Sequence, residues 1–167
     1  MDNITLNMEN LSENEREQLM KLVKKANEQK NSNVWKPEIN ETYWYVSDRK
    51  IDYYDYVNDP TDRFLYAIGN CFKSKEEAEF AFKRAKVIAE LKRFAEENNG
   101  ELDFKSATKR KYHIQYSTYV DAIFIDYIYN DVQNEIYFSS EQIARDAIKS
   151  IGEDRLKKYY FGFAREV

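Results

Sequence analysis

The residue types that could do chemistry in this chain begin with its single histidine, His113, and its single cysteine, Cys71. A nucleophilic triad or dyad would have to use one of them, and a structural zinc site needs four such ligands. His113 lies between Tyr112 and Ile114 in a segment typical of a strand, which favours a structural or surface role. Cys71 stands just before an expected helix, whose N-terminus lowers a thiol pKa, but a small buried hydrophobic residue is its commoner role. The sequence therefore favours neither nucleophilic catalysis nor a structural zinc site.

Carboxylates are plentiful, with 30 aspartate and glutamate residues in a chain of 167. Five aspartates in strand-forming segments could bind a divalent ion in a nuclease or a glycosidase: Asp48, Asp52, Asp55, Asp121 and Asp126. No histidine or lysine recurs beside them at a fixed spacing. We therefore expect no bound metal and no other cofactor, with a carboxylate-metal-dependent phosphodiesterase or nuclease as the alternative.

Tyrosines accompany these aspartates. The tripeptide Ile51-Asp52-Tyr53 recurs as Ile125-Asp126-Tyr127, and strand geometry places each aspartate on the face opposite its neighbours. Tyrosine offers a large apolar surface and a free hydroxyl, which makes it common in binding hot spots. We predict an acidic, tyrosine-rich binding face made of Tyr45, Asp52, Tyr53, Asp55, Tyr56, Tyr116, Asp121, Asp126 and Tyr127. The alternative is that these residues reflect strand composition alone.

The distribution of charge supports a basic partner. The net charge is −4, and residues 112–138 contain four acidic residues and no lysine or arginine. Binding to phosphates needs the opposite sign, so direct nucleic-acid binding is disfavoured. A nucleic-acid-binding module would have to use Lys83, Arg84, Lys86, Lys92 and Arg93, which alternate with glutamates. The run Lys109-Arg110-Lys111 is expected to be a solvated turn.

An internal repeat dominates the organisation of the chain. Residues 72–82 align without a gap on residues 138–148, at a constant offset of 66. Phe, Ser and two Ala coincide, and Leu91 echoes Leu156 at an offset of 65. Two copies are too few for a solenoid, so the repeat indicates a duplicated strands-then-helix module.

Periodicity and turn residues place the elements that must hold these side chains. Helices are predicted at residues 12–30, 75–98, 140–150 and 155–160, and strands at residues 43–46, 51–57, 64–68, 112–119, 122–129 and 135–138. Three serines are candidate caps: Ser12, Ser74 and either Ser139 or Ser140. The expected buried face of the helix over 75–98 is Ala78, Ala81, Phe82, Ala85, Ile88, Ala89 and Phe94.

The predicted fold class is α+β. An N-terminal helix and linker (1–34) precede two β-β-β-α units (35–99 and 100–167), which we expect to pack into one body. The narrow apolar stripe of the N-terminal helix allows a homodimer through that helix. No apolar run approaches a membrane span and no signal peptide is evident, so we expect a cytoplasmic protein with no membrane partner.

Four strings of residues are distinctive: Trp35-Lys36-Pro37, Tyr43-Trp44-Tyr45-Val46, residues 69–79 (GNCFKSKEEAE) and residues 136–141 (IYFSSE). These strings resemble a group of small uncharacterised accessory proteins encoded by phages and prophages of low-GC Gram-positive bacteria, over roughly residues 33–162. The resemblance implies no catalytic residues. It implies a non-virion protein of the infected cell, in a class where anti-defence proteins, including anti-CRISPR proteins, are common.

Together these observations predict a non-enzymatic phage accessory binding protein. We expect it to be a stoichiometric inhibitor of a host defence or nucleic-acid-handling protein, which the acidic, tyrosine-rich face would bind. The partner would be a basic protein of the host cell cytoplasm.

Overall fold

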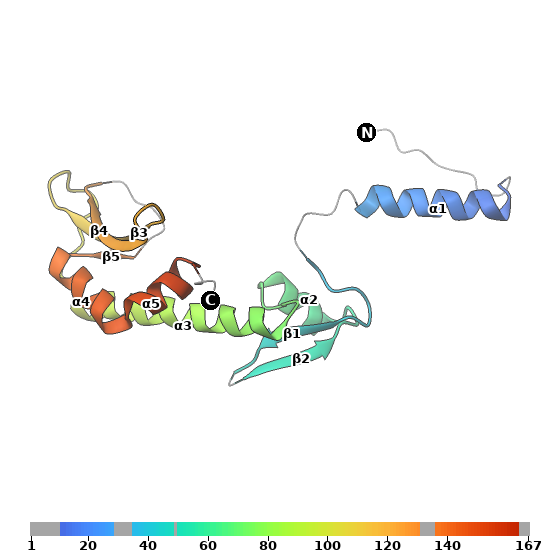
Figure 1. The fold of residues 1–167 in the computed structure, drawn as a ribbon, viewed down its shortest axis with the longest axis horizontal. Helices are drawn as coiled ribbons and strands as arrows, with labels where there is room; N and C mark the ends of the chain where they lie inside the picture. Colours follow the sequence, from blue (N-terminus) through green and yellow to red (C-terminus); the bar gives the residue numbers. More distant parts are fainter. Residues whose placement is uncertain (1–10, 29–34, 49, 131–135, 164–167) are drawn as a thin grey trace. The chain divides into compact units, whose positions relative to one another are not determined.

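The computed structural model describes residues 11–28, 35–48, 50–130 and 136–163 of an α+β protein with two small antiparallel sheets (Figure 1). The chain divides into two units, Met1–Glu38 and Ile39–Val167. Both sheets lie in the second unit, and each unit is described by itself below.

The first unit contains helix α1 (Glu13–Glu28). The amide of Ser12 donates to Glu15 Oε2 at 2.8 Å, which is the reciprocal half of a capping box. Leu22 and Val23 are 63% and 42% exposed. An isolated helix of this length is marginally stable in water, so its exposed apolar residues need a partner to contribute to stability.

The second unit begins with a hairpin. Strand β1 (Thr42–Val46) pairs antiparallel with β2 (Ile51–Asp55). On the other side of β1, Trp44 and Phe72 exchange two backbone hydrogen bonds of 2.9 and 2.8 Å. Phe72 therefore acts as a one-residue third strand, and β2 is the outer edge of this sheet.

The strand predicted at residues 64–68 is wrong, because this segment belongs to helix α2 (Pro60–Ala67). Asp59 caps the helix by accepting from the amide of Asp62 at 2.8 Å, and proline occupies its first turn. Proline fits the first turn because its missing N–H is unneeded there. These start signals outweigh the strand preference of the aromatic residues that follow.

The second sheet has the order β4-β3-β5. Its strands are β3 (Lys111–Ser117), β4 (Ala122–Ile128) and the short β5 (Tyr137–Phe138), all antiparallel to their neighbours. Tyr112 of β3 lies opposite Tyr127 on one side and Phe138 on the other. β4 is therefore the outer edge of this sheet, as β2 is of the first.

Four helical segments complete the unit: α3 (Lys75–Asn98), α4 (Glu141–Ile151), the short α5 (Glu153–Arg155) and a π-helical turn η1 (Leu156–Tyr160). The predicted break between α4 and α5 occurs at Gly152, whose φ of 93° is costly for any residue with a side chain.

The main core lies where the C-terminal half of α3 meets α4 and the second sheet. It consists of Val87, Leu91, Ala95, Ile114, Phe138, Ala144, Ala147, Ile151 and Leu156. The expected buried face of α3 is only partly right, since Phe82, Ala85 and Ala89 are exposed. The buried stripe instead follows Val87, Leu91 and Ala95 at intervals of four residues, because that side faces α4.

Several aligned positions occupy similar environments. Ser74 and Ser140 cap α3 and α4, each accepting from the amide three residues on at 3.2 Å. Ala78 and Ala144, each four residues after its cap serine, are both fully buried. The cap of α4 is thus Ser140, as the offset of 66 predicts, and Ser139 instead accepts from the Gly100 amide.

Candidate functional site

The nine residues of the predicted binding face lie on two separate sheets. On the first sheet the register places Tyr45 opposite Asp52 on one face, while Tyr53 and Asp55 point to the other face. Tyr56 follows β2 and is only 2% exposed, with its hydroxyl donating to Asn58 Oδ1 at 3.0 Å. The residues therefore do not form one continuous face on this sheet.

The same alternation divides the second sheet. Tyr116 and Tyr127 share a face with Ile114 and Ile125, which lean on the core. Asp126 points to the opposite face and is exposed. Asp121 lies in the turn between β3 and β4, where it accepts a hydrogen bond from the Tyr116 hydroxyl.

Cations from other segments neutralise part of the acidic charge. Lys50 forms an ion pair of 2.9 Å with Asp52, and Lys157 forms one of 3.2 Å with Asp121. The hydrogen bond from Lys50, followed by the one from the Tyr53 amide, lowers the pKa of Asp52. Charge counts within sequence windows missed the Lys157 pair because its two partners are 36 residues apart.

A third cation, Arg110, sits 4.4 Å above the centre of the Tyr127 ring. Its guanidinium also donates to Tyr129, and this hydrogen bond lowers the pKa of that hydroxyl. One side of the second sheet's tyrosine cluster is therefore basic. No spacing rule in the sequence reveals this role of Arg110.

Asp55 and Asp126 keep their charge free of ion pairs among the described residues. Asp55 accepts from the Thr42 hydroxyl at 2.6 Å across the hairpin. Asp126 accepts from the amide of Tyr127 at 2.8 Å. Both side chains are exposed, so they are the strongest negative points of the two edge strands.

The two edge strands share one unusual contact, an aspartate that accepts from the next amide along the strand. Asp52 binds the Tyr53 amide at 3.2 Å, as Asp126 binds that of Tyr127. The backbone groups of Trp44 form hydrogen bonds with Phe72, so Trp44 and Tyr53 are a non-hydrogen-bonded pair. The Tyr53 amide therefore points off the outer edge of β2. Charged residues on an edge strand hinder uncontrolled pairing with other strands.

A buried carboxylate, Asp62, joins α2 to the hairpin. It is 1% exposed and accepts from the Tyr43 hydroxyl and the Val57 amide, both at 2.8 Å. Burial opposes its ionisation, but these hydrogen bonds and that of the Asp59 amide outweigh the burial and lower the pKa of Asp62. Burial and the neighbouring Asp62 charge raise the pKa of Tyr43. The arrangement is closed to solvent and holds structure.

The two candidate nucleophilic residues are poorly placed for catalysis. His113 is 3% exposed, with its ring centre 5.8 Å from that of Tyr137 and its Nε2 2.6 Å from Gln115 Nε2. Burial, with the nearby charges of Asp62 and Glu41, raises the pKa of the Cys71 thiol to about 11. The thiolate is therefore scarce at neutral pH.

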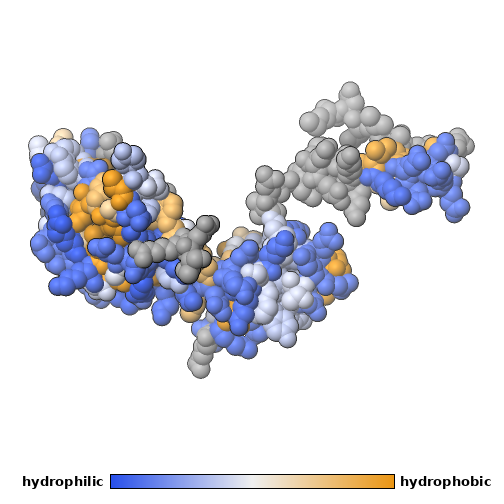
Figure 2. Space-filling model, in the orientation of Figure 1, coloured by the Kyte–Doolittle hydropathy of each residue, from blue (hydrophilic) through white to orange (hydrophobic). Residues whose placement is uncertain are grey.

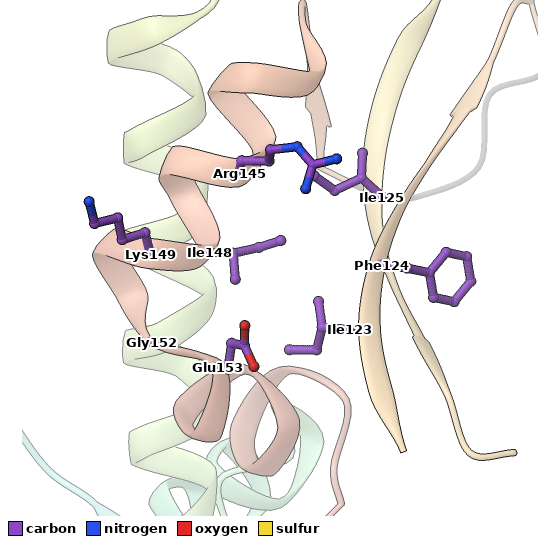
Figure 3. A pocket seen from close by; sticks show the side chains of 8 residues that line it. All are labelled: Ile123, Phe124, Ile125, Arg145, Ile148, Lys149, Gly152 and Glu153. Carbon is purple, nitrogen blue, oxygen red and sulfur yellow. The ribbon is translucent and has the colours of Figure 1, made fainter. Parts of the chain in front are cut away.

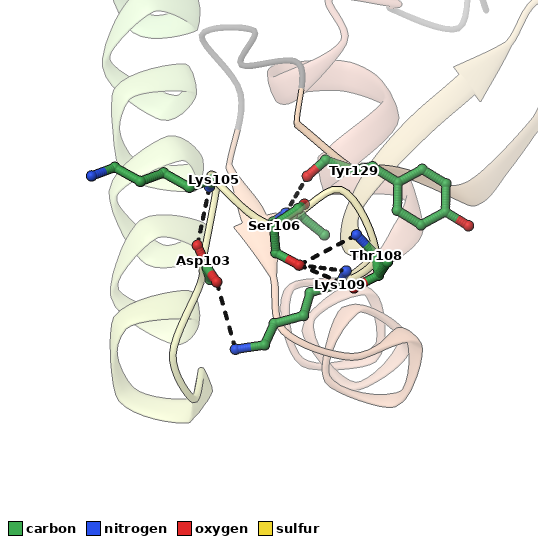
Figure 4. Close-up of polar contacts among 7 residues, drawn as sticks. Asp103, Lys105, Ser106, Thr108, Lys109 and Tyr129 are labelled. Atoms are coloured by element: carbon green, nitrogen blue, oxygen red, sulfur yellow. Dashed lines mark hydrogen bonds and ion pairs between the residues drawn. The ribbon is translucent and has the colours of Figure 1, made fainter.

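The prediction of a solvated turn at residues 109–111 is wrong for Lys111, which is 1% exposed. Its ammonium donates to the carbonyl of Ser106 at 3.0 Å and to that of Tyr129, and lies 5.7 Å from the Phe104 ring centre. Figure 4 shows that the Ser106 hydroxyl also accepts hydrogen bonds from the amides of Thr108 and Lys109. The lysine ties the loop before β3 to the end of β4, which is a structural role.

A groove of about 450 Å³ opens between β4 and α4. Figure 3 shows Ile123, Ile125 and Ile148 directed into it, whereas Phe124 points to the other side of the strand. Arg145 reaches over the groove from α4, and Glu153 lies at its other end. In Figure 2, hydrophobic atoms gather over this part of the three-stranded sheet. A smaller pocket of about 260 Å³ lies between the hairpin and α2, lined by Tyr43, Tyr45 and Tyr54 among others.

Other expected sites receive no support from the geometry. Within the described ranges, histidine, cysteine and acidic side chains do not assemble into any group of three or more that could hold a metal ion. The basic residues of α3 named above are exposed but share the helix with glutamates, and Lys83 approaches Glu79 at 3.9 Å. No helix in the part of the chain that the structure describes is long and apolar enough to cross a membrane.

Comparison of the chain with protein-family models, with curated proteins and with solved structures gives no match.

Proposed function

We propose that this chain is a non-enzymatic binding protein whose outer edge strands, β2 and β4, recognise a basic protein. Each strand carries an exposed aspartate, Asp55 on β2 and Asp126 on β4, and an exposed tyrosine, Tyr53 at 60% and Tyr127 at 41% exposure. Tyrosine supplies contact area with little loss of side-chain entropy, and acidic groups supply long-range attraction.

The observation that carries the proposal is the recurrence of one arrangement on both edges. Ile-Asp-Tyr occupies the outer strand of each sheet, with the aspartate bound to the following amide in both. A binding surface used twice accounts for the recurrence of the exposed tyrosines Tyr53 and Tyr127, which the core does not need. The effective acidic points are Asp55 and Asp126, because Asp52 and Asp121 have lysine partners.

The partner we propose is a host defence or nucleic-acid-handling protein, inhibited stoichiometrically in the cytoplasm of an infected cell. The phage setting rests on the sequence resemblance. The chemistry of the partner rests on charge, since a protein that binds nucleic acid presents the basic surface that Asp55 and Asp126 would meet.

Affinity capture tests this proposal. Tagged protein is incubated with lysate of a low-GC Gram-positive bacterium at low and high salt, and bound proteins are identified by mass spectrometry. One dominant basic protein, captured at low salt and lost at high salt, is the expected result. A blank capture by folded protein counts against the proposal for that host.

We also propose that the two halves of the second unit are copies of one module, consisting of a hairpin, a short third strand and a helix. Support comes from aligned pairs with equal roles: Phe72 and Phe138 as third strands, Ser74 and Ser140 as caps, and Leu91 and Leu156 in the core. Helix α2 is then an insertion of the first copy.

For the first unit, we propose that α1 pairs with the α1 of a second copy of the chain. The exposed Leu22 and Val23 need cover. The first half of the helix is net acidic, with three glutamates and Arg16, and the second half is net basic, with three lysines and Glu28. An antiparallel pair brings the acidic half of each helix to the basic half of the other, so the charges favour that orientation.

A further inference from the structure

The groove beside β4 has the geometry of a place for one more strand. We propose that it binds an extended peptide of a partner protein, which adds to the edge of β4 and places alternate apolar side chains against Ile123, Ile125 and Ile148. This inference goes beyond the charged edge residues of the proposed function, because it rests on the backbone of β4 and on the apolar groove.

The backbone of β4 is oriented for such pairing. The Tyr137 carbonyl accepts from Asn99 Nδ2 at 2.8 Å, and the Ser139 amide donates to Asn99 Oδ1 at 2.9 Å, so both groups point away from β3. The backbone groups of Phe138, which lies between these two residues, therefore point toward Tyr112 of β3. In antiparallel strands, hydrogen-bonded and non-hydrogen-bonded pairs alternate. The backbone groups of Tyr112 therefore point away from β4, and those of Tyr127, which lies opposite Tyr112, point off the outer edge of β4.

The same alternation continues along β4. Two and four residues before Tyr127, the amides and carbonyls of Ile125 and Ile123 also point off the edge. The Tyr127 amide donates a hydrogen bond to the Asp126 carboxylate. For Ile123 and Ile125, no contact among the described residues takes up these groups. The unoccupied stretch coincides with the groove.

Side chains make the stretch favourable for an extended peptide. Ile123 and Ile125 share one face of β4, and Ile148 of α4 lies across the groove from them (Figure 3). A strand added there would direct every second side chain to the isoleucines, which is how strand addition obtains both affinity and specificity.

Charge selects the kind of peptide. The groove is lined by two cations, Arg145 and Lys149, and one carboxylate, Glu153, and Arg145 also forms an ion pair with Glu141 one turn earlier on α4. Arg145 extends toward Ile125 and lies at the apolar surface. The occupant is therefore an extended segment with apolar residues at alternate positions and an acidic residue beside Arg145.

A labelled synthetic peptide tests this proposal. The probe has about ten residues, alternates isoleucine with threonine and carries one glutamate, and it is compared with a peptide of the same composition in scrambled order. Fluorescence anisotropy measures binding, and amide hydrogen exchange reports on Ile123 and Ile125. We expect saturable binding of the alternating peptide, about tenfold tighter than the scrambled one, with slower exchange at both amides. Equal binding of the two peptides, or unchanged exchange, overturns the proposal.

Variants of β4 and α4 distinguish backbone pairing at the edge from non-specific apolar binding. Ile125→Pro removes an amide that points off the edge and leaves the β3 ladder intact, so it should abolish probe binding. Phe124→Ala, whose side chain points away from the groove, is the matched control and should bind normally. Arg145→Glu should weaken the glutamate probe and favour one with lysine instead. Equal affinity of all three variants for the glutamate probe contradicts the proposal, as does a dimer of the free protein that Ile125→Pro dissolves.

Asp126→Ala distinguishes this inference from the proposed function. Its loss frees the Tyr127 amide, lengthens the available edge and should tighten probe binding, whereas it should weaken capture of a basic partner. A protein that loses its basic partner in this variant yet ignores the probe overturns strand addition alone. The converse result overturns the charged-edge proposal alone.

Discussion

The hydrogen bond between the Tyr43 hydroxyl and the Asp62 carboxylate joins two elements through buried polar atoms. Tyr43→Phe removes the donor and leaves the buried carboxylate with one partner fewer. Hydrogen bonds to charged groups contribute about 1.5–3 kcal/mol, so we expect a loss of that order in the free energy of unfolding. Urea denaturation measures it. Tyr54→Phe, at an exposed ring on the same hairpin face, is the control and should change stability little.

The pH dependence of stability follows from the lowered pKa of Asp62. Below its pKa in the folded protein the carboxyl is protonated in both states and the contribution disappears. Above the unfolded value of about 3.9 the contribution is complete. Stability should therefore fall as the pH drops from about 4 through the folded pKa, and Asp62→Asn should flatten this part of the curve. An unchanged acid limb in Asp62→Asn would show that other carboxylates govern it.

Single residues also mark the limit of prediction from sequence at this scale. His113 is buried within a strand, as its neighbours in the chain predict, whereas Cys71 is half-buried rather than fully buried. The contacts of Arg110 with Tyr127 and of Lys157 with Asp121 do not follow, because residues far apart in sequence make them. A charge count over a segment therefore overestimated the acidity of the second sheet.

At the scale of elements, the proposed duplication predicts that corresponding segments of the two modules are exchangeable. Replacing residues 74–78 with the sequence of residues 140–144 keeps the cap serine, the buried alanine and the start of the helix. We expect the chimera to fold with native helix content and a melting temperature close to that of the parent, measured by circular dichroism. The same exchange shifted by one residue, using residues 139–143, is the control: it keeps a serine at position 74 but replaces the buried Ala78 with isoleucine, and it should destabilise the protein. Equal stability of both chimeras would count against equivalent modules.

Helix α1 provides a second test at this scale. Lys21→Glu with Lys25→Glu changes the net charge of the helix from 0 to −4, and Glu13→Lys with Glu17→Lys changes it from 0 to +4. Like charges should keep each variant monomeric, whereas an equimolar mixture should pair. Light scattering after gel filtration reports twice the chain mass for the parent and for the mixture alone. Dimers of the separate variants, or none in the mixture, would refute antiparallel pairing.

The sequence predicted elements well where local rules decide and poorly where they compete. Ser140 and Gly152 mark the ends of α4 because caps and positive φ are local requirements. The aromatic composition of residues 64–68 indicates a strand, but the Asp59-Pro60 start signal decides in favour of a helix. The buried stripe of α3 could not be read reliably, since several apolar stripes are present and only the position of α4 selects one.

At the scale of the whole molecule, the residues of the predicted binding face lie on two separate sheets, whose outer edge strands are β2 and β4. Alternation along the strands distributes the nine residues over both faces of two sheets, and Tyr56 is buried. What recurs is the outer strand with its aspartate and tyrosine, and beside β4 an apolar groove that residue spacing did not indicate. The groove is lined by residues of β4 and of α4, so it depends on how these two elements pack together.

The most direct measurement is the affinity of the purified protein for the captured partner, by isothermal titration calorimetry at low and high salt. Asp55→Lys combined with Asp126→Lys should weaken binding at least about tenfold at low salt and remove most of its salt dependence. Glu96→Lys combined with Glu97→Lys makes the same change of charge on the exposed side of α3 and should bind like the parent. Equal affinity of the parent and both variants would contradict recognition through the edge strands.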